Sequence, residues 1–211
     1  MSELVVVGIP NGSFDQNCWL LADADSRQAV MVDPGEEGDR FLAELRQREW
    51  TLTDIWLTHA HIDHILGVAT VHAATGVPIH LHGADRDLYE NLPQQAQWFG
   101  LRASTPPPVT HWLSQDQVLL VGSHHFTVRH VPGHAPGHVA FVTPGIIVGG
   151  DVLFAGSIGR TDLPGGNMAE LEASIRKEFY TLPDETRVLT GHGPETTIGE
   201  ERRSNPFVRD R

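Results

Sequence analysis

The chain has 211 residues, 40% of them hydrophobic, which is enough to bury a core without disulfide bonds. Its one cysteine, Cys18, excludes an intrachain disulfide and fits a reducing cytoplasm, and the net charge of −12 argues against a nucleic-acid partner. Because we find neither a membrane-spanning segment nor a signal peptide, we expect a cytoplasmic protein with no membrane partner.

The hydrophobic pattern predicts two runs of strands, each followed by helices. Strands are expected at 4–9, 17–23, 28–33, 54–58, 77–82, 117–121, 125–131, 138–143, 146–150 and 187–190. Helices are expected after strand 28–33, with Phe41, Leu42 and Leu45 on one face, and at 63–75, 84–91, 168–180 and 196–204. The segment 92–112 breaks this rhythm. Strands followed by helices twice over indicate two sheets packed between helices.

The densest group of metal-binding residue types follows strand 54–58, in the run Thr58–His64, which reads THAHIDH. An extended stretch projects alternate side chains to one side, so His59 and His61 can bind a metal ion together. Asp63 and His64 fall where a helical pattern begins, which turns them toward a second nearby position. Imidazole nitrogen and carboxylate oxygen suit Zn²⁺ and Fe²⁺, so this run predicts a metal site.

Three more candidate ligands each follow an apolar strand pattern and stand beside glycine. His134 comes after strand 125–131, Asp151 ends the apolar run 146–150, and His192 comes after strand 187–190. Strand ends are where an α/β scaffold presents its chemistry, and glycine lets the backbone approach a metal or a substrate closely. We therefore expect these three side chains to join the first group.

The order of these motifs resembles the metallo-β-lactamase superfamily over about Val5 to Phe207, nearly the whole chain. Asp33, in Val-Asp-Pro-Gly, resembles the superfamily's first motif, a buried aspartate that braces the metal loops. The segments 157–166 and 191–197 look like the short glyoxalase II-like hydrolases. The resemblance implies an α/β fold, a four-layer αββα sandwich, in one domain that lacks the C-terminal helical domain of full-length glyoxalase II.

The resemblance also implies a binuclear centre with two divalent ions, zinc first and iron or manganese as alternatives. The implied ligands are His59, His61 and His134 for one ion, Asp63, His64 and His192 for the other, and Asp151 as the bridge. A hydroxide between the ions would attack a thioester carbonyl, with Asp63 also orienting that hydroxide. The implied partner is a small-molecule thioester such as S-lactoylglutathione, cleaved to lactate and glutathione.

Five side chains around this centre have predicted supporting roles. His138 is expected to hold a ligand loop without binding metal. Arg160 and Asp162 lie in a loop that can close over the ions, and Arg160 either binds a substrate carboxylate or pairs with an aspartate to fix the loop. Trp98 and Phe99 either wall the site or anchor the irregular segment, and we favour the anchor.

Two other functions remain open. The element Gly159–Asp162 is shared with persulfide dioxygenases, which would use one Fe²⁺ and leave positions open for dioxygen. A metal-stabilised binding module without activity is ranked last, because structural zinc sites are closed and four-coordinate. The sequence leaves the oligomeric state open between a monomer and a small homo-oligomer.

Overall fold

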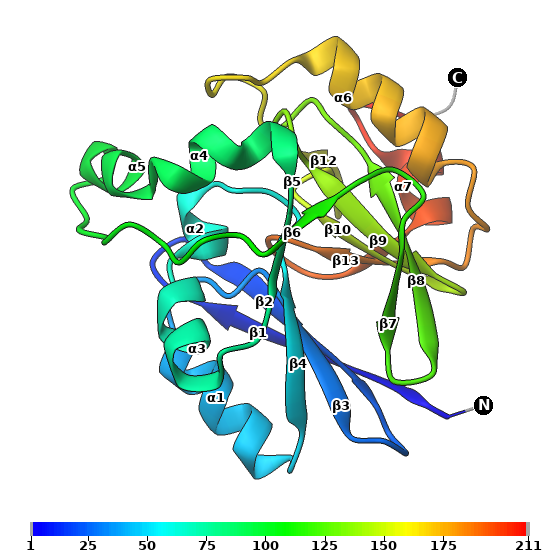
Figure 1. Cartoon of the computed structure of the whole chain (residues 1–211). Coiled ribbons are helices and arrows are strands. Elements are labelled where there is room, and N and C mark those ends of the chain that lie inside the picture. The colour runs from blue at the N-terminus through cyan, green and yellow to red at the C-terminus, as the bar shows by residue number, and fades with distance from the viewer. Residues whose placement is uncertain (1, 210–211) are drawn as a thin grey trace.

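A computed structural model describes residues 2–209, and it consists of two six-stranded sheets with helices on their outer sides (Figure 1). The first sheet takes its strands from the first half of the chain, in the order β1-β2-β3-β4-β5-β6. The second takes its strands from the second half, in the order β14-β13-β10-β9-β8-β7. The predicted α/β class and four-layer αββα sandwich are confirmed.

Antiparallel pairing joins the first three strands, and parallel pairing joins the rest of the first sheet. Its strands are β1 (Leu4–Asn11), β2 (Gln16–Asp23), β3 (Gln28–Val32), β4 (Thr51–Trp56), β5 (Ile79–His82) and β6 (His111–Leu113). Parallel neighbours need crossover connections, and helices supply them. These helices are α1 (Gly38–Gln47), α2 (Ile62–Ile65), α3 (Val68–Thr75), the 3₁₀ turn η1 (Gly83–Asp85), α4 (Arg86–Glu90) and α5 (Leu92–Trp98).

The second sheet is antiparallel except where β10 and β13 run parallel. Its strands are β7 (Val118–Val121), β8 (His124–His130), β9 (Val139–Thr143), β10 (Ile146–Gly150), β13 (Arg187–Thr190) and β14 (Thr196–Thr197). A small separate hairpin pairs β11 (Leu153–Phe154) with β12 (Ser157–Ile158). The helices of this half are α6 (Met168–Ser174), the π-helical turn η2 (Ile175–Phe179) and α7 (Ile198–Ser204).

Three hydrophobic cores lie between the four layers, one at each boundary. One core lies between the first sheet and its helices and includes Phe41 of α1. The central core lies between the two sheets, where the Trp56 ring packs 5.5 Å from Phe126 and 5.0 Å from Phe141 between centroids. The third lies between the second sheet and its helices and includes Phe179. Each sheet is therefore buried on both faces.

Two expected elements differ in the structure. The helix predicted at 63–75 is broken into α2 and α3 because the Gly67 N–H donates to the Pro34 carbonyl, 2.9 Å away, and not to the preceding helical turn. The segment predicted to be irregular from residue 92 begins with α5, and only the part after it lacks helix until β6. The two-residue strands β11, β12 and β14 were not predicted, because two residues are too few to show the alternation of apolar and polar side chains that marks a strand.

The ends of several strands meet at one edge of the sandwich. Parallel strands β3 and β4 end there, as do β10 and β13, so their following loops lie together. Backbone hydrogen bonds join the two halves at this edge, from the Asn17 N–H to the Gly191 carbonyl and from the Val139 N–H to the Thr58 carbonyl, both 2.7 Å. None of the helices within residues 2–209 is long and apolar enough to cross a bilayer.

Candidate metal centre

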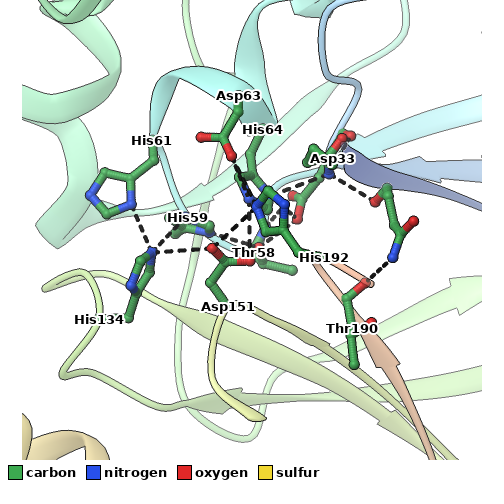
Figure 2. A network of polar contacts seen from close by, with 12 residues as sticks. Asp33, Thr58, His59, His61, Asp63, His64, His134, Asp151, Thr190 and His192 are labelled. Atoms are coloured by element: carbon green, nitrogen blue, oxygen red, sulfur yellow. Dashed lines mark hydrogen bonds and ion pairs between the residues drawn. The ribbon is translucent and has the colours of Figure 1, made fainter. Parts of the chain in front are cut away.

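Two imidazoles of one loop, His59 and His61, meet a third from a distant part of the chain, His134 (Figure 2). His134 Nε2 lies 2.8 Å from His61 Nδ1 and 3.2 Å from His59 Nε2. Two nitrogens bound to one tetrahedral zinc ion at about 2.05 Å would be about 3.3 Å apart, so this spacing is close to that of a ligand set. The separation in sequence is 75 residues between His59 and His134.

The protonation of these rings favours metal binding. His134 Nδ1 donates to the Arg160 carbonyl, 2.7 Å away, which leaves its Nε2 lone pair free. The Thr58 hydroxyl donates to Asp33 and therefore accepts from His59 Nδ1, 3.0 Å away, with the same result. Burial, and next the neighbouring His134, lower the pKa of His61 to about 3, so this ring is neutral near neutral pH. All three nitrogens are available as ligands.

A second cluster contains Asp63, His64 and His192. The Nδ1 atom of His64 donates to Asp33, 2.9 Å away, and that of His192 donates to the Phe14 carbonyl, 3.1 Å away. Their Nε2 atoms therefore face Asp63 Oδ2, at 3.5 Å from His64 and 3.0 Å from His192. His64 Nε2 is buried without a hydrogen bond among the described residues, which is costly for a polar atom unless an ion takes it.

Asp151 lies between the two clusters. Its Oδ1 is 3.3 Å from His64 Nε2, and its Oδ2 is 3.5 Å from both His134 Nε2 and His192 Nε2. The Asp151 N–H donates to His138 Nε2, and the His138 ring stacks on His59 with centroids 4.6 Å apart. Asp151 therefore faces imidazoles of both clusters, and His138 contacts both Asp151 and His59.

The centre stabilises positive charge. Burial opposes charge on His64, yet the carboxylates of Asp151 and Asp63 raise its pKa well above the usual value. Burial likewise opposes ionisation of Asp151, but His64 and the other imidazoles hold its pKa far below the usual value. The pKa of Asp63 is lowered in the same way, with burial opposed mainly by His64. The donor set and this field both fit divalent cations.

Asp33 connects the two clusters through hydrogen bonds. One carboxylate oxygen accepts from the Thr58 N–H at 2.7 Å, and the other accepts from the Thr58 hydroxyl and from His64 Nδ1. Its backbone has a φ of 52°, in the left-handed region that aspartate tolerates better than most residues. Asp33 thus orients one imidazole of each cluster, His59 through Thr58 and His64 directly.

Two buried side chains hold the first metal loop, and sequence reasoning missed both. Asp85 accepts hydrogen bonds from the Ala60 N–H at 3.0 Å and the Gly137 N–H at 2.5 Å, which ties the loop of His59 to that of His134. Gln95 accepts from the Ile62 N–H and donates to the Ala60 carbonyl. Burial raises the pKa of Asp85 to about 6. No local motif marks these residues, because their partners are backbone groups far away in sequence.

A pocket of about 360 Å³ opens over the ligands. It is bordered by residues of both clusters and by apolar side chains, Trp98 and Phe99 among them. Trp98 is 61% exposed and Phe99 is 46% exposed, and both border the pocket, as the alternative interpretation from the sequence proposed; Phe99 also packs on Phe14, so an anchoring role stays a prediction. Gly191 allows the ligand loops to approach, because a Cβ there would lie 2.0 Å from Asp151 Oδ1.

Arg160 and Asp162 form an exposed ion pair at the pocket. The guanidinium donates to both carboxylate oxygens, at 2.7 and 2.8 Å. The loop-fixing contact expected from the sequence is therefore present, and Arg160 also lines the pocket. A substrate role for Arg160 stays a prediction.

The Metallo-beta-lactamase superfamily matches residues 11–192 of the chain. Hydroxyacylglutathione hydrolase GloC from Haemophilus influenzae is 39% identical over 204 residues, which cover 95% of this chain and 96% of that protein. The chain is also similar to TTHA1623, crystallised in a di-iron-bound form (41% identity, TM-score 0.88, 96% of this chain and 100% of that one). The BLEG-1 B3 metallo-beta-lactamase superposes with a TM-score of 0.92 at 38% identity, covering 98% of this chain and 100% of that one.

Proposed function

Since the chain belongs to the metallo-beta-lactamase superfamily and is a metallo-hydrolase with a histidine-rich metal site, we propose that it cleaves glutathione-type thioesters with two metal ions. S-lactoylglutathione, hydrolysed to lactate and glutathione, is the proposed reference substrate. The observation that carries the proposal is the position of Asp151 between two three-ligand clusters. The name of the GloC relative supports the thioester, and the di-iron form of TTHA1623 supports two ions.

The proposed ligand sets are those of the two clusters. One ion would be held by His59, His61 and His134, the other by Asp63, His64 and His192, with Asp151 shared between them. Zinc is the first choice, with iron or manganese as alternatives, because imidazole and carboxylate accept all three. When bound, two such ions lower the pKa of a water between them and polarise a thioester carbonyl.

The side chains then have defined tasks in the hydrolysis. The oxygen of water joins the acyl carbon, the carbon–sulfur bond breaks, and the thiol part leaves as a thiolate. One proton of the water neutralises this thiolate, and the carboxylic acid that forms releases the other to solvent. Asp63 Oδ2, at the pocket side of the second cluster, would accept a hydrogen bond from the attacking water and orient it. Apolar walls around the pocket would exclude other water from the ester. No serine or cysteine nucleophile is needed.

The test is to measure metal content together with three activities. Protein purified without added metal, and portions reloaded with zinc, iron or manganese, would be assayed for S-lactoylglutathione cleavage, for oxygen uptake with glutathione persulfide and for β-lactam hydrolysis. We expect nearly two ions per chain and thioester cleavage. One iron per chain with oxygen uptake would establish the dioxygenase alternative, and β-lactam hydrolysis alone would favour the activity named for BLEG-1.

Arg160→Ala is expected to raise KM for an anionic thioester about fivefold to tenfold, and to change KM for a neutral thioester less than twofold. A guanidinium contact with a carboxylate supplies about 1.5–3 kcal/mol, part of which Asp162 already takes in the free protein. The backbone carbonyl that holds His134 remains in this variant. Steady-state kinetics on the two substrates would measure the difference.

The matched control is Arg187→Ala, which removes an exposed arginine paired with Glu195 outside the residues that line the pocket. It should leave both KM values unchanged. Equal effects of Arg160→Ala on the anionic and the neutral thioester would show that this arginine acts only by fixing its loop.

A further inference from the structure

Two parts of the pocket wall come from different segments of the chain, and only one of them carries an arginine. Three aromatic side chains, Phe14, Trp98 and Phe99, form what we call the aromatic wall. They come from the turn between β1 and β2 and from the end of α5. The loop after β10 supplies another part of the wall, where Arg160 stands among the mainly apolar side chains of Phe154, Ile158, Leu163 and Pro164. No lysine and no arginine other than Arg160 is among the described residues that border the pocket.

The aromatic wall is preformed and accessible. The rings of Phe14 and Phe99 meet edge to face, with centroids 5.3 Å apart and planes at 87°. Trp98, the neighbour of Phe99, exposes 61% of its surface. Large apolar side chains that face solvent beside a polar centre contribute little to the hydrophobic core, and such exposed clusters mark ligand-binding surfaces.

The position of Arg160 indicates which half of a thioester each part of the wall would bind. The glutathione half carries carboxylates, and Arg160 is the cationic group that it can reach beside the pocket. The acyl half is then left to face the aromatic wall. A lactoyl group offers this wall a single methyl, whereas a pocket of about 360 Å³ has room for a much larger apolar group.

We propose that the aromatic wall of Phe14, Trp98 and Phe99 selects thioesters whose acyl group carries a bulky apolar side chain, such as phenyl, over the lactoyl thioester. This inference rests on the proposed thioester hydrolysis and specifies its substrate class. Covering a phenyl ring with three aromatic side chains removes apolar surface from water at both partners, which corresponds to a preference of about tenfold or more.

The test compares two glutathione thioesters that differ only in the acyl group, 2-hydroxypropanoyl and 2-hydroxy-2-phenylacetyl. We expect kcat/KM of the metal-loaded protein to be about tenfold or more higher for the phenyl substrate. In the double variant Trp98→Ala/Phe99→Ala this ratio should fall to near one. Trp112→Ala is the matched control, because Trp112 is also exposed, lies under Arg86 and does not border the pocket. It should keep the wild-type ratio.

A binding measurement separates the inference from the proposed function. Calorimetry with two hydrolysis-resistant glutathione thioethers, one with a methyl and one with a phenylalkyl group on sulfur, needs no turnover. Tighter binding of the phenylalkyl compound that is lost in the double variant would support the aromatic wall even if neither thioester were cleaved, which would overturn only the proposed function. Equal kcat/KM for the two thioesters, or an unchanged ratio in the double variant, would overturn the inference while leaving the hydrolase proposal in place.

Discussion

His61→Ala is expected to abolish thioester cleavage, with kcat reduced by about 10³-fold or more, and to lower the metal content from two ions to one. The reason is geometric. His61 Nδ1 lies 2.8 Å from His134 Nε2, so the variant removes one of the three nitrogens that would hold the first ion. The fold should persist, because the Ala60 and Ile62 backbone groups keep their hydrogen bonds to Asp85 and Gln95.

Metal analysis, kinetics and circular dichroism on the same preparation would measure these three effects. His125→Ala is the matched control, because His125 is an exposed histidine on β8 that lies outside both clusters. It should keep two ions and wild-type activity. Full activity in His61→Ala would refute the assignment of His61 as a ligand.

Asp151→Ala is expected to remove both ions together, with the apparent affinity for each reduced by at least about 100-fold and turnover lost. The carboxylate faces His64 with one oxygen and both His134 and His192 with the other. Without it, five imidazoles and Asp63 would remain around the two cations, and less negative charge would offset the repulsion between the cations.

Titration of the metal-free variant with zinc, followed by calorimetry, would show whether the two binding steps disappear together. Asp151→Asn tests the charge with nearly unchanged volume, and an amide with one carbonyl oxygen should not restore the bridge. Asp39→Ala, at an exposed position in the first turn of α1, controls for loss of an aspartate. Retention of one tightly bound ion in Asp151→Ala would show that the carboxylate serves a single metal.

Sequence reasoning could predict those parts of the molecule that rest on local patterns. The apolar residues Phe41, Leu42 and Leu45 recur at helical spacing and predict α1. The continuous apolar run before Asp151 predicts the buried strand β10. The His59–His64 run indicates metal binding because four residues of metal-binding type lie within six positions. The positions of His134 and His192 after strands and beside glycine suggested that they join this group, but the division of the ligands between two ions came from the resemblance, because contacts across so many residues leave no local signal.

The features that the sequence did not predict depend on hydrogen bonds and close contacts between residues far apart in the chain. Gly67 ends a helical turn because its N–H reaches the Pro34 carbonyl, and a Cβ there would lie 2.3 Å from the Gly35 carbonyl oxygen. Asp85 resembles any acidic residue at the start of a helix until its two distant backbone partners are known. Such contacts depend on how the sheets are placed against each other, which hydrophobic periodicity does not encode.

The division of the strands between the halves of the chain has a consequence for synthesis on the ribosome. Strands β1 to β6 are complete at residue 113, and the second sheet is made entirely from later residues. Each three-ligand cluster that we propose for an ion draws members from both parts, so a nascent chain that ends before His134 can complete neither. The first cluster would be complete only after His134 is made and the second only after His192, so the ions would join the two parts of the chain late in synthesis.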